Sequence, residues 1–403
     1  MIFSGDDGMF VRSRQLDQLK DSISDSSIKV IYGVRRGGKT TLLEQFRSYL
    51  RRQGIAGERI IYYDFDHAIN SHLLDPNTIS QEIKKKLTAG KTTFVFLDEL
   101  EKLPDYSVLI GRLVKMKSVD LYVTSSSMKI KALADMYCCH YIYLGPLSFQ
   151  EYLACHHYEA TLNNLYHYLN SGGFPFAQDI RSHSSIQNYF EDVINTIIVN
   201  SFLQKGALCN PSLARQLAVF LANQTGQFTN VSQAVTALQD NQIKVSNKTL
   251  SAYLTLLQDS FLFAPCQELN RRTGKAKTTN VQYFPVDSCL HWILTNHHGA
   301  LSETNLTTVV FNELRNRGYQ VFTACSDRHP VTFIARRNGQ QHFFQFNFSI
   351  LSAAAYQQAT DGLRHVPNKY PKTLIIAKPG DLTWTESHED FKVISLIEWL
   401  MEK

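Results

Sequence analysis

The sequence lacks CxxC motifs, a basic leader and long apolar runs, and each absence excludes a class of protein. Its seven cysteines form no CxxC pair, and the adjacent Cys138 and Cys139 cannot easily bridge each other, which favours reduced thiols over a disulfide framework. The start, MIFSGDDGMF, carries two acids where a secretory signal needs a basic flank. No apolar run approaches the ~18 residues that span a bilayer. We therefore predict a cytoplasmic protein with no membrane partner.

Neither sign of charge dominates the sequence. Lysines and arginines number 41 against 36 aspartates and glutamates, so the net charge is +5, and the basic residues are spread along the chain. This mild excess is only a weak indication of nucleic-acid binding. The 403 residues, of which 44% are apolar, are too many for one hydrophobic core. We expect two or three domains.

The stretch GVRRGGKTTLL, which begins at Gly33, is the most informative feature that is present. The preceding SIKVIYG is a β-branched run typical of a buried strand. The following residues place apolar side chains on one helical face, at Leu42, Leu43, Phe46, Tyr49 and Leu50. Strand, glycine-rich loop and helix together predict a phosphate-binding loop, in which backbone N–H groups and the helix N-terminus face an anion. The alternative is a glycine-rich turn that opens an ordinary helix.

This loop predicts an ATP site with Mg²⁺ as the metal cofactor. Lys39 would reach the β- and γ-phosphates, and the hydroxyl of Thr40 would bind the metal. The predicted nucleotide-binding residues are Gly33, Arg35, Arg36, Gly37, Gly38, Lys39, Thr40 and Thr41.

A second chemical feature is the segment TTFVFLDELEKL, in which an apolar run ends in Asp98 and Glu99. A buried strand of this kind would place Asp98 beside the phosphate loop, where it can hold Mg²⁺. Glu99 could then polarise the attacking water. Glu99 and Lys39 are therefore the predicted catalytic residues. A strand followed by a solvated acidic turn is the alternative.

Two further strands accompany these motifs. RIIYYDFD lies between the loop and the acidic strand in the chain, an added strand that ATPases with a catalytic glutamate have and that nucleoside kinases and small GTPases usually lack. VDLYVTSSS ends in hydroxyls, and in such ATPases a polar side chain at this strand end contacts the γ-phosphate or the water. Thr124 and Ser126 are the sensor candidates, although serines at a strand end also form simple turns.

Five segments, GVRRGGKTTLL, FLDELEKL, VTSSS, LGPLSFQEYL and LNSGGFP, stand in an order and spacing that resembles the prokaryotic AAA-type P-loop ATPases with a C-terminal domain of unknown function. The similarity runs nearly end to end. It implies an α/β fold: a P-loop NTPase domain of the AAA-like (ASCE) type with a parallel sheet, then a winged helix and a restriction-endonuclease-like α/β domain. Within LGPLSFQEYL, Ser148 and Glu151 have the spacing of a helix capping box.

The chain departs from this family just before the PLSF segment. Members usually carry a Gly-Arg pair there, whose arginine can act on a neighbouring site, whereas this chain has YCCHYIYLG. Because such a finger is typically worth about 10³ to 10⁵ in rate, we expect slow hydrolysis unless Arg35, Arg36 or a partner compensates. His140 could occupy the place, but a lone histidine near a strand is more often a packing or surface residue.

The segment from 206 to 290 predicts a winged helix, with helices in PSLARQLAVFLANQTG, NVSQAVTALQ and SNKTLSAYLTLLQDSFLF and a basic hairpin around RRTGKAK. In a DNA-binding version the helix from 249 to 259 would enter the major groove, and the wing would contact phosphates. The nucleic-acid candidates are Lys248, Arg271, Arg272, Lys275 and Lys277. The third helix carries mainly an apolar stripe that belongs to the core, and winged helices also bind proteins. A protein partner is therefore an alternative to nucleic acid.

For the last hundred residues, the family resemblance implies a restriction-endonuclease-like fold, here without its metal cluster. NLTTVVFNELRNRGYQVFTA indicates a helix and a strand, and VTFIARRNGQQHFFQFNFS indicates a hairpin that turns at its Asn-Gly pair. Where similar proteins carry Asp and Glu-x-Lys, this chain has Thr332, Gln345 and Asn347, and only Glu313 remains. Since a divalent cation needs carboxylates, we predict no nuclease activity.

We expect four segments: a P-loop ATPase domain at 1–155, a helical lid or linker at 156–205, the winged helix at 206–290 and the inactive nuclease-like domain at 291–403. Two functions compete. The first is an ATPase, converting ATP and water to ADP and phosphate, whose nucleotide state acts on C-terminal domains that contact nucleic acid. The second is a nucleotide-dependent protein-interaction module with little hydrolysis and no nucleic-acid role. A kinase is a distant third, and an oligomer is compatible with either function.

Overall fold

The fold is described from a computed structural model of the chain. The structure describes residues 10–66, 75–203, 210–271, 273–296, 301–325, 328–379 and 390–402. The chain divides into two compact units. Unit 1 comprises residues 1–144 with 259–261, and unit 2 comprises residues 145–258 with 262–403.

Unit 1 is built on a five-stranded parallel sheet with the strand order β2-β3-β4-β1-β5. The strands are β1 (Ile28–Tyr32), β2 (Ile60–Asp64), β3 (Thr93–Asp98), β4 (Val119–Ser125) and β5 (Cys139–Tyr143). The helices are α1 (Ser13–Asp21), α2 (Lys39–Arg52), α3 (Pro76–Lys86) and α4 (Tyr106–Leu113). This architecture confirms the predicted α/β P-loop fold class, with a strand and a helix on either side of the glycine-rich loop.

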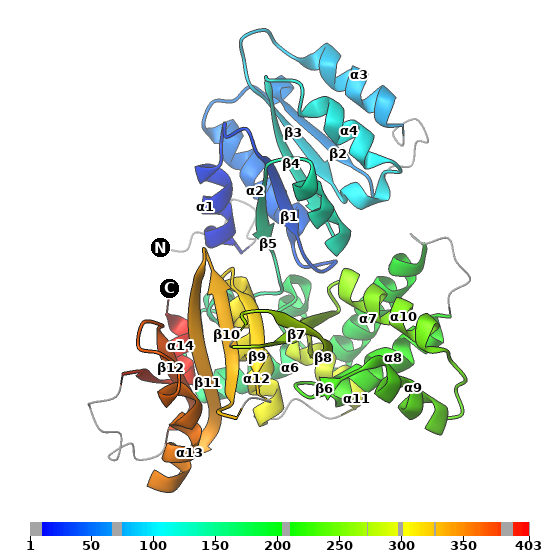
Figure 1. Ribbon diagram of the computed structural model, residues 1–403. Helices are drawn as coiled ribbons and strands as arrows, with labels where there is room; N and C mark the ends of the chain where they lie inside the picture. Colours follow the sequence, from blue (N-terminus) through cyan, green and yellow to red (C-terminus); the bar gives the residue numbers. More distant parts are fainter. Residues whose placement is uncertain are drawn as a thin grey trace. The chain divides into compact units, whose positions relative to one another are not determined.

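Helices cover both faces of this sheet (Figure 1). On one face, apolar residues of α1 and α2 pack against Phe94 and Phe96 of β3. On the other face, apolar residues of α3 and α4 pack against Val95 and Leu97. Successive β3 residues therefore alternate between two apolar layers, which explains why this strand reads as an unbroken apolar run. Because helices cover both faces of the sheet, a ligand is expected to bind at the carboxyl ends of the strands.

The strand that separates β1 from β3 in the sheet is β4. The strand predicted from RIIYYDFD is β2, which precedes β3 in the chain but lies at the edge of the sheet. A strand pattern indicates an extended segment but not which strands pair with it, so the sequence predicts β2 but not its position in the sheet. As a consequence, the segment after β4 lies between the glycine-rich loop and the acids that end β3.

Unit 2 begins with helices: α5 (Phe149–His156), α6 (Leu162–Ser171), α7 (His183–Leu203), α8 (Pro211–Asn223), α9 (Val231–Asp240) and α10 (Asn247–Asp259). The predicted capping box starts α5. The Ser148 hydroxyl accepts the Glu151 N–H at 3.2 Å, and the Glu151 carboxylate accepts the Ser148 N–H at 2.8 Å. The LNSGGFP segment is tied to α11 (Ser288–Thr295), because the Gly173 N–H donates to the buried carboxylate of Asp287 at 2.6 Å.

An eight-stranded mixed sheet with the order β13-β12-β11-β10-β9-β7-β8-β6 runs through the rest of unit 2. Its strands are β6 (Phe228–Thr229), β7 (Phe263–Leu269), β8 (Ala276–Pro285), β9 (Gln320–Ala324), β10 (Val331–Arg337), β11 (Gln340–Ile350), β12 (Lys372–Pro379) and β13 (Lys392–Ser395). The strands β6, β8 and β7 pair antiparallel. In the chain, β6 lies between α8 and α9, and β7 and β8 follow α10. A parallel contact between Glu268 of β7 and Thr323 of β9 joins them to the remaining strands.

Helices cover opposite faces of the C-terminal strands. Phe333 of β10 and Phe344 of β11 share a core with α12 (Glu303–Asn316) and α14 (Leu396–Met401). The neighbouring residues Ile334 and Phe343 share another core with α13 (Ala353–Arg364). The β10–β11 hairpin, the long pair of orange strands in Figure 1, turns as predicted at Asn338 and Gly339, whose φ values are 52° and 78°.

One core spans the segments 206–290 and 291–403, because Phe284 of β8 lies in the same apolar cluster as Phe311 and Phe333. The four-segment division and the names winged helix and restriction-endonuclease-like stay predictions. Within the described residues, no helix combines the length and the apolar character that a bilayer crossing requires.

The contact between α13 and the residues before β10 generates a stability prediction. A Cβ atom added to Gly362 would lie 1.9 Å from the Pro330 carbonyl oxygen. Alanine has a better helix propensity than glycine by about 1 kcal/mol, but the backbone clash should reverse this gain. We expect Gly362→Ala to lower the free energy of unfolding by about 1–3 kcal/mol in denaturant titrations.

Gly111→Ala in α4 is the matched control for this variant. A Cβ atom there would approach only the hydroxyl of Tyr137, at 2.9 Å, and that flexible side chain can move aside. Equal stability of the two variants would contradict the proposed close packing at Gly362.

Candidate functional site

The glycine-rich loop turns sharply between β1 and α2. Gly33 directly follows β1 and packs against the backbone of Leu144, so that a Cβ atom on Gly33 would lie 2.0 Å from the Leu144 carbonyl oxygen. A Cβ atom on Gly37 would lie 3.0 Å from the Val34 carbonyl oxygen. Gly38 precedes α2 with a φ of 95°, and Arg36 also has a positive φ of 64°. The glycine positions of the predicted loop are therefore required by close approach and backbone conformation.

Lys39 points into the site as a buried ammonium group, with 3% of the residue exposed. Its Nζ lies 3.1 Å from the Val34 carbonyl oxygen, 2.7 Å from the Ser126 hydroxyl and 3.1 Å from Oε1 of Glu99. A buried ammonium needs a compensating charge, and Glu99 supplies it. The structure thus brings together three residues that the sequence predicted separately.

Asp98 ends β3 almost fully buried, with 1% exposed. Its Oδ1 accepts a hydrogen bond from the Thr124 hydroxyl, and its Oδ2 accepts one from the Tyr62 hydroxyl at 2.9 Å. Burial and the charge of Asp98 raise the pKa of Tyr62, so that its hydroxyl stays a donor. Tyr62 carries no motif in the sequence. It meets Asp98 because β2 pairs with β3.

Glu99 lies directly after β3 in a left-handed backbone conformation, with φ 51°. Its Oε1 also accepts the Ser126 hydroxyl at 2.7 Å, and its N–H donates to the Thr124 hydroxyl at 2.8 Å. Burial alone would raise the pKa of Glu99, but the Lys39 ammonium and the Ser126 hydroxyl outweigh it and lower the pKa to about 2. Its buried Oε2 accepts no hydrogen bond from the described residues. Glu99 is therefore an ionised carboxylate with one oxygen available to a further donor.

Glu101 is a site residue that the sequence analysis missed. Its Oε1 accepts the backbone N–H of Ser126 at 2.8 Å, so it holds the residue that links Lys39 to Glu99. Burial and the nearby Glu99 charge raise the pKa of Glu101 to about 8. The only sequence signal was its place two residues after Glu99 in the same acidic segment.

The remaining predicted loop residues lie around this centre. Arg35 makes an ion pair with Asp66, at 2.5 Å between Nη2 and Oδ2, and its Nη1 lies 3.7 Å from Oε2 of Glu99. Arg36 and Thr40 are exposed, and Thr41 is half-buried. Thr40, in the first turn of α2, and Asp98 are the residues that would hold a metal ion. Asp66, which follows β2, was also missed by the sequence analysis, as were Tyr62 and Glu101.

His140 lies away from this site. It pairs with Lys29 in the register of β5 and β1, four residues before Gly33 and about 13 Å back along the strand. Because the strands are parallel, His140 is near the amino ends, opposite the edge that carries the glycine-rich loop. It cannot act as a finger on the site of its own chain.

The basic residues proposed for nucleic acid divide into two groups. Lys248 and Lys275 are exposed. Arg271 instead donates to the carbonyl oxygens of His329 and His365, and Lys277, although also exposed, makes an ion pair with Glu268 at 2.8 Å. Arg272 lies outside the described residues. Two of the predicted wing cations therefore already serve contacts within unit 2.

The neutral residues at the expected nuclease positions do lie together. The Thr332 N–H donates to the Gln345 side chain at 3.1 Å, and the Gln345 amide lies 3.4 Å from Oδ1 of Asn347. Glu313 is buried on α12 and accepts from Arg317 at 2.6 Å. The cluster is thus held by amide and hydroxyl groups, and the Glu313 charge is matched by an arginine.

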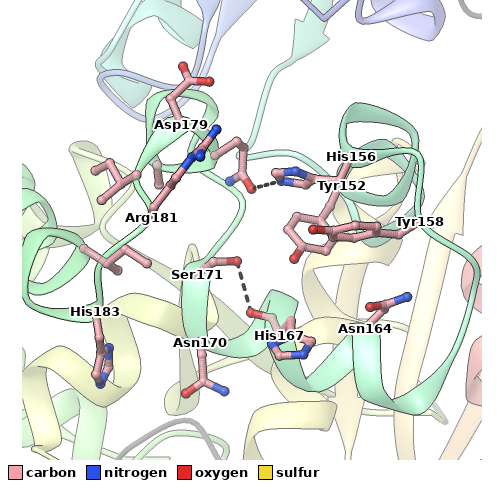
Figure 2. A pocket seen from close by; sticks show the side chains of 14 residues that line it. Tyr152, His156, Tyr158, Asn164, His167, Asn170, Ser171, Asp179, Arg181 and His183 are labelled. Carbon is pink, nitrogen blue, oxygen red and sulfur yellow. Dashed lines mark hydrogen bonds between the residues drawn. The ribbon is translucent and has the colours of Figure 1, made fainter.

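A cavity of about 860 Å³ in unit 2 was not predicted by any motif. Figure 2 shows that imidazole, phenol and amide groups from α5, α6 and the segment before α7 surround it. The rings of His156 and Tyr158 stack in its wall, and His156 is 3.0 Å from the Gln178 side-chain oxygen. The sequence marked this region only as a lid or linker.

A parallel sheet of this order, with a lysine-bearing loop after β1 and paired acids after β3, defines a P-loop nucleotide-binding domain. Residues 25–153 match the family model described as AAA domain (AAA_14), and residues 162–298 match one described as a domain of unknown function (DUF8612). An uncharacterized protein of Haemophilus influenzae is 30% identical over 98% of this chain and 99% of its own length. The chain therefore belongs to the family of prokaryotic AAA-type P-loop ATPases with a C-terminal domain of unknown function.

More distant similarities extend to archaea. An uncharacterized protein of Methanocaldococcus jannaschii is 23% identical over 80% of this chain and 72% of its own length. A solved Walker-type ATPase of Pyrococcus abyssi is 13% identical, with a TM-score of 0.48 over 73% of this chain and 98% of that one. The resemblance predicted from the five motifs is confirmed by the family models and the Haemophilus relative.

The position of Lys39 generates a binding prediction. Replacing it by alanine should remove the ammonium at the centre of the predicted phosphate site. Hydrogen bonds to charged groups are worth about 1.5–3 kcal/mol, so Lys39→Ala should weaken ATP binding in calorimetry by at least about tenfold. Lys115→Ala, at an exposed position after α4, is the control and should bind as the unmodified chain does. Unchanged affinity in Lys39→Ala would contradict the predicted phosphate site.

Proposed function

We propose that the protein binds ATP with Mg²⁺ and hydrolyses it slowly, and that its nucleotide state acts on C-terminal segments that contact nucleic acid. The observation that carries the ATPase part is the contact of Lys39, Glu99 and Ser126 at the carboxyl ends of the sheet. An ammonium, a carboxylate and a hydroxyl at this edge are the groups that phosphoryl transfer to water uses.

In this proposal the loop residues from Gly33 to Thr41 surround the phosphates with backbone N–H groups. Lys39 contacts the β- and γ-phosphates, and Thr40 with Asp98 would hold Mg²⁺. A bound Mg²⁺ would neutralise phosphate charge. Glu99 orients the attacking water through the carboxylate oxygen that accepts no hydrogen bond from the described residues. Thr124 contacts the carboxylate of Asp98 and the N–H of Glu99, Ser126 contacts the carboxylate of Glu99, and the two hydroxyls act as sensors.

The ion pair between Lys39 and Glu99 suggests how binding would prepare the catalytic acid. A γ-phosphate carries more negative charge than one carboxylate, so it competes for the lysine. Once Lys39 turns to the phosphate, Glu99 loses its main counter-charge and becomes a better acceptor for a water proton. Nucleotide binding and the activation of Glu99 would then be one event.

Slow hydrolysis is proposed because the usual arginine before the PLSF segment is missing from the sequence. Within the site, Arg35 is the nearest substitute, since its guanidinium already lies 3.7 Å from Glu99. A partner that supplies an arginine is the other route to faster turnover. A finger is typically worth about 10³ to 10⁵ in rate.

The proposed nucleic-acid contact uses the winged-helix arrangement of α8, α9, α10 and the β7–β8 hairpin. Lys248 at the start of α10 and Lys275 in the hairpin turn are exposed and would contact phosphates. Arg271 and Lys277 contribute less, because both are engaged within unit 2. Binding should therefore be weak, salt-dependent and independent of sequence.

A protein-interaction module with little hydrolysis is the second candidate. The engagement of Arg271 and Lys277 favours it, because it reduces the positive charge that the wing offers to phosphates. In either case we propose that the nuclease-like segment is inactive, since Thr332, Gln345 and Asn347 are neutral and Glu313 is paired with Arg317.

Glu99→Gln tests the catalytic role. Glutamine keeps the shape of the side chain but cannot take a proton, so we expect ATP binding to persist while turnover falls by about 10²- to 10⁴-fold. Phosphate release measures turnover, and calorimetry measures binding. Glu58→Gln, at an exposed site before β2, should leave both unchanged. Wild-type turnover in Glu99→Gln would remove Glu99 from its role.

ATP turnover with and without nucleic acid separates the two candidate functions. We expect single-stranded or duplex DNA to raise the turnover rate at low salt, because the exposed lysines bring phosphates to unit 2. Lys248→Ala with Lys275→Ala should reduce this stimulation without changing turnover in the absence of DNA. If no nucleic acid alters turnover while ATP still changes the protease sensitivity of the chain, the interaction module is the better account.

A further inference from the structure

Two histidines and an aspartate of unit 2 converge outside the proposed nucleotide site. His329 lies before β10, whereas Asp361 and His365 lie one turn apart at the end of α13. Nδ1 of His329 is 2.7 Å from Oδ2 of Asp361, and Nδ1 of His365 is 3.5 Å from Oδ1 of the same carboxylate. One nitrogen or oxygen atom from each residue can be chosen so that all three lie within 4.8 Å of one another.

The two histidines and Asp361 make more contacts than a single ion pair would. The two imidazole rings stack with their centroids 3.4 Å apart and their planes 10° from parallel. Nδ1 of His365 also lies 2.9 Å from the backbone carbonyl oxygen of Asp361. Both rings nevertheless turn the same nitrogen toward one carboxylate.

The backbone that carries these residues is held in two independent ways. Gly362, next to Asp361, lets α13 approach Pro330, next to His329, more closely than any side chain would allow. The guanidinium of Arg271 bridges the carbonyl oxygens of His329 and His365, at 2.9 and 3.1 Å. The side chains are thus presented by a frame that does not depend on the contacts among them, which is the preorganisation that a ligand site needs.

We propose that His329, Asp361 and His365 form a binding site for a divalent transition-metal ion of the Zn²⁺ class. Imidazole nitrogens with one carboxylate suit Zn²⁺, Co²⁺ and Ni²⁺, whereas Mg²⁺ prefers oxygen ligands alone. The side chains are 28%, 45% and 49% exposed, so water can complete the coordination shell. Coordination would replace the present hydrogen bonds of the two Nδ1 atoms.

A bound ion would connect α13 to the residues before β10, beside the hairpin turn that carries Arg271. Its role would be to stabilise this corner of unit 2. The site is distinct from the proposed Mg²⁺ site in unit 1 by residue and by ligand chemistry, so the two proposals fail independently.

The test is metal binding by the full chain without nucleotide or Mg²⁺. We expect one equivalent of Co²⁺ to give visible d–d absorption and Zn²⁺ to displace it, with Zn²⁺ raising the melting temperature. Asp361→Asn and His329→Gln should each weaken Zn²⁺ binding at least about tenfold, since even groups outside the first coordination shell typically change affinity about 10- to 100-fold. Neither variant should alter ATP binding.

His167→Gln is the matched control, because His167 is an exposed histidine elsewhere in unit 2, and it should bind Zn²⁺ as the unmodified chain does. The chain has 14 histidines, so stoichiometry alone does not locate the ion. Equal Zn²⁺ affinity in all variants, or no binding to the unmodified chain, would overturn the proposal and leave the three residues as a hydrogen-bonded cluster.

Discussion

The ion pair between Lys39 and Glu99 is the interaction on which the nucleotide site depends. Both side chains are buried, and either charge alone at this place would be costly to keep. The pair fixes the loop after β1 to the end of β3, and the Ser126 hydroxyl brings in the end of β4. Only a ligand with comparable negative charge can replace Glu99 as the partner of Lys39. This requirement connects the geometry of the sheet to the proposed binding of a triphosphate.

One β-sheet and one apolar core extend across the predicted winged-helix and nuclease-like segments of unit 2. The β7–β8 hairpin belongs to the same sheet as the C-terminal strands, and Phe284 shares a core with Phe311 and Phe333. The basic residues that the sequence pattern assigns to the wing can therefore contact either the adjoining C-terminal strands and helices or a nucleic acid. Arg271 faces carbonyl groups of its own unit, so its charge is partly used by the fold. This shared use is the physical reason why nucleic-acid contact is proposed as weak.

The parts of the site that were predictable have local signals. The glycine-rich loop, the capping box of Ser148 and the turn at Asn338 each depend on residues within a few positions of one another. Tyr62 and Glu101 were not predictable in this way. Tyr62 reaches Asp98 only because β2 pairs with β3, and Glu101 matters because its carboxylate meets the Ser126 N–H from another strand.

The sequence by itself determined the chain order of β1, α2, β2, β3 and β4, the residue types at the phosphate loop and membership of the AAA-type family. The tertiary structure alone decided that β4 separates β1 from β3, that His140 lies at the wrong edge, and that Arg271 joins the segments bearing His329 and His365. Periodicity, turns and caps arise from steric contacts and hydrogen bonds between near neighbours in the chain. The partner of a buried charge is instead decided by which distant segment occupies the adjoining space, and no local pattern records that choice.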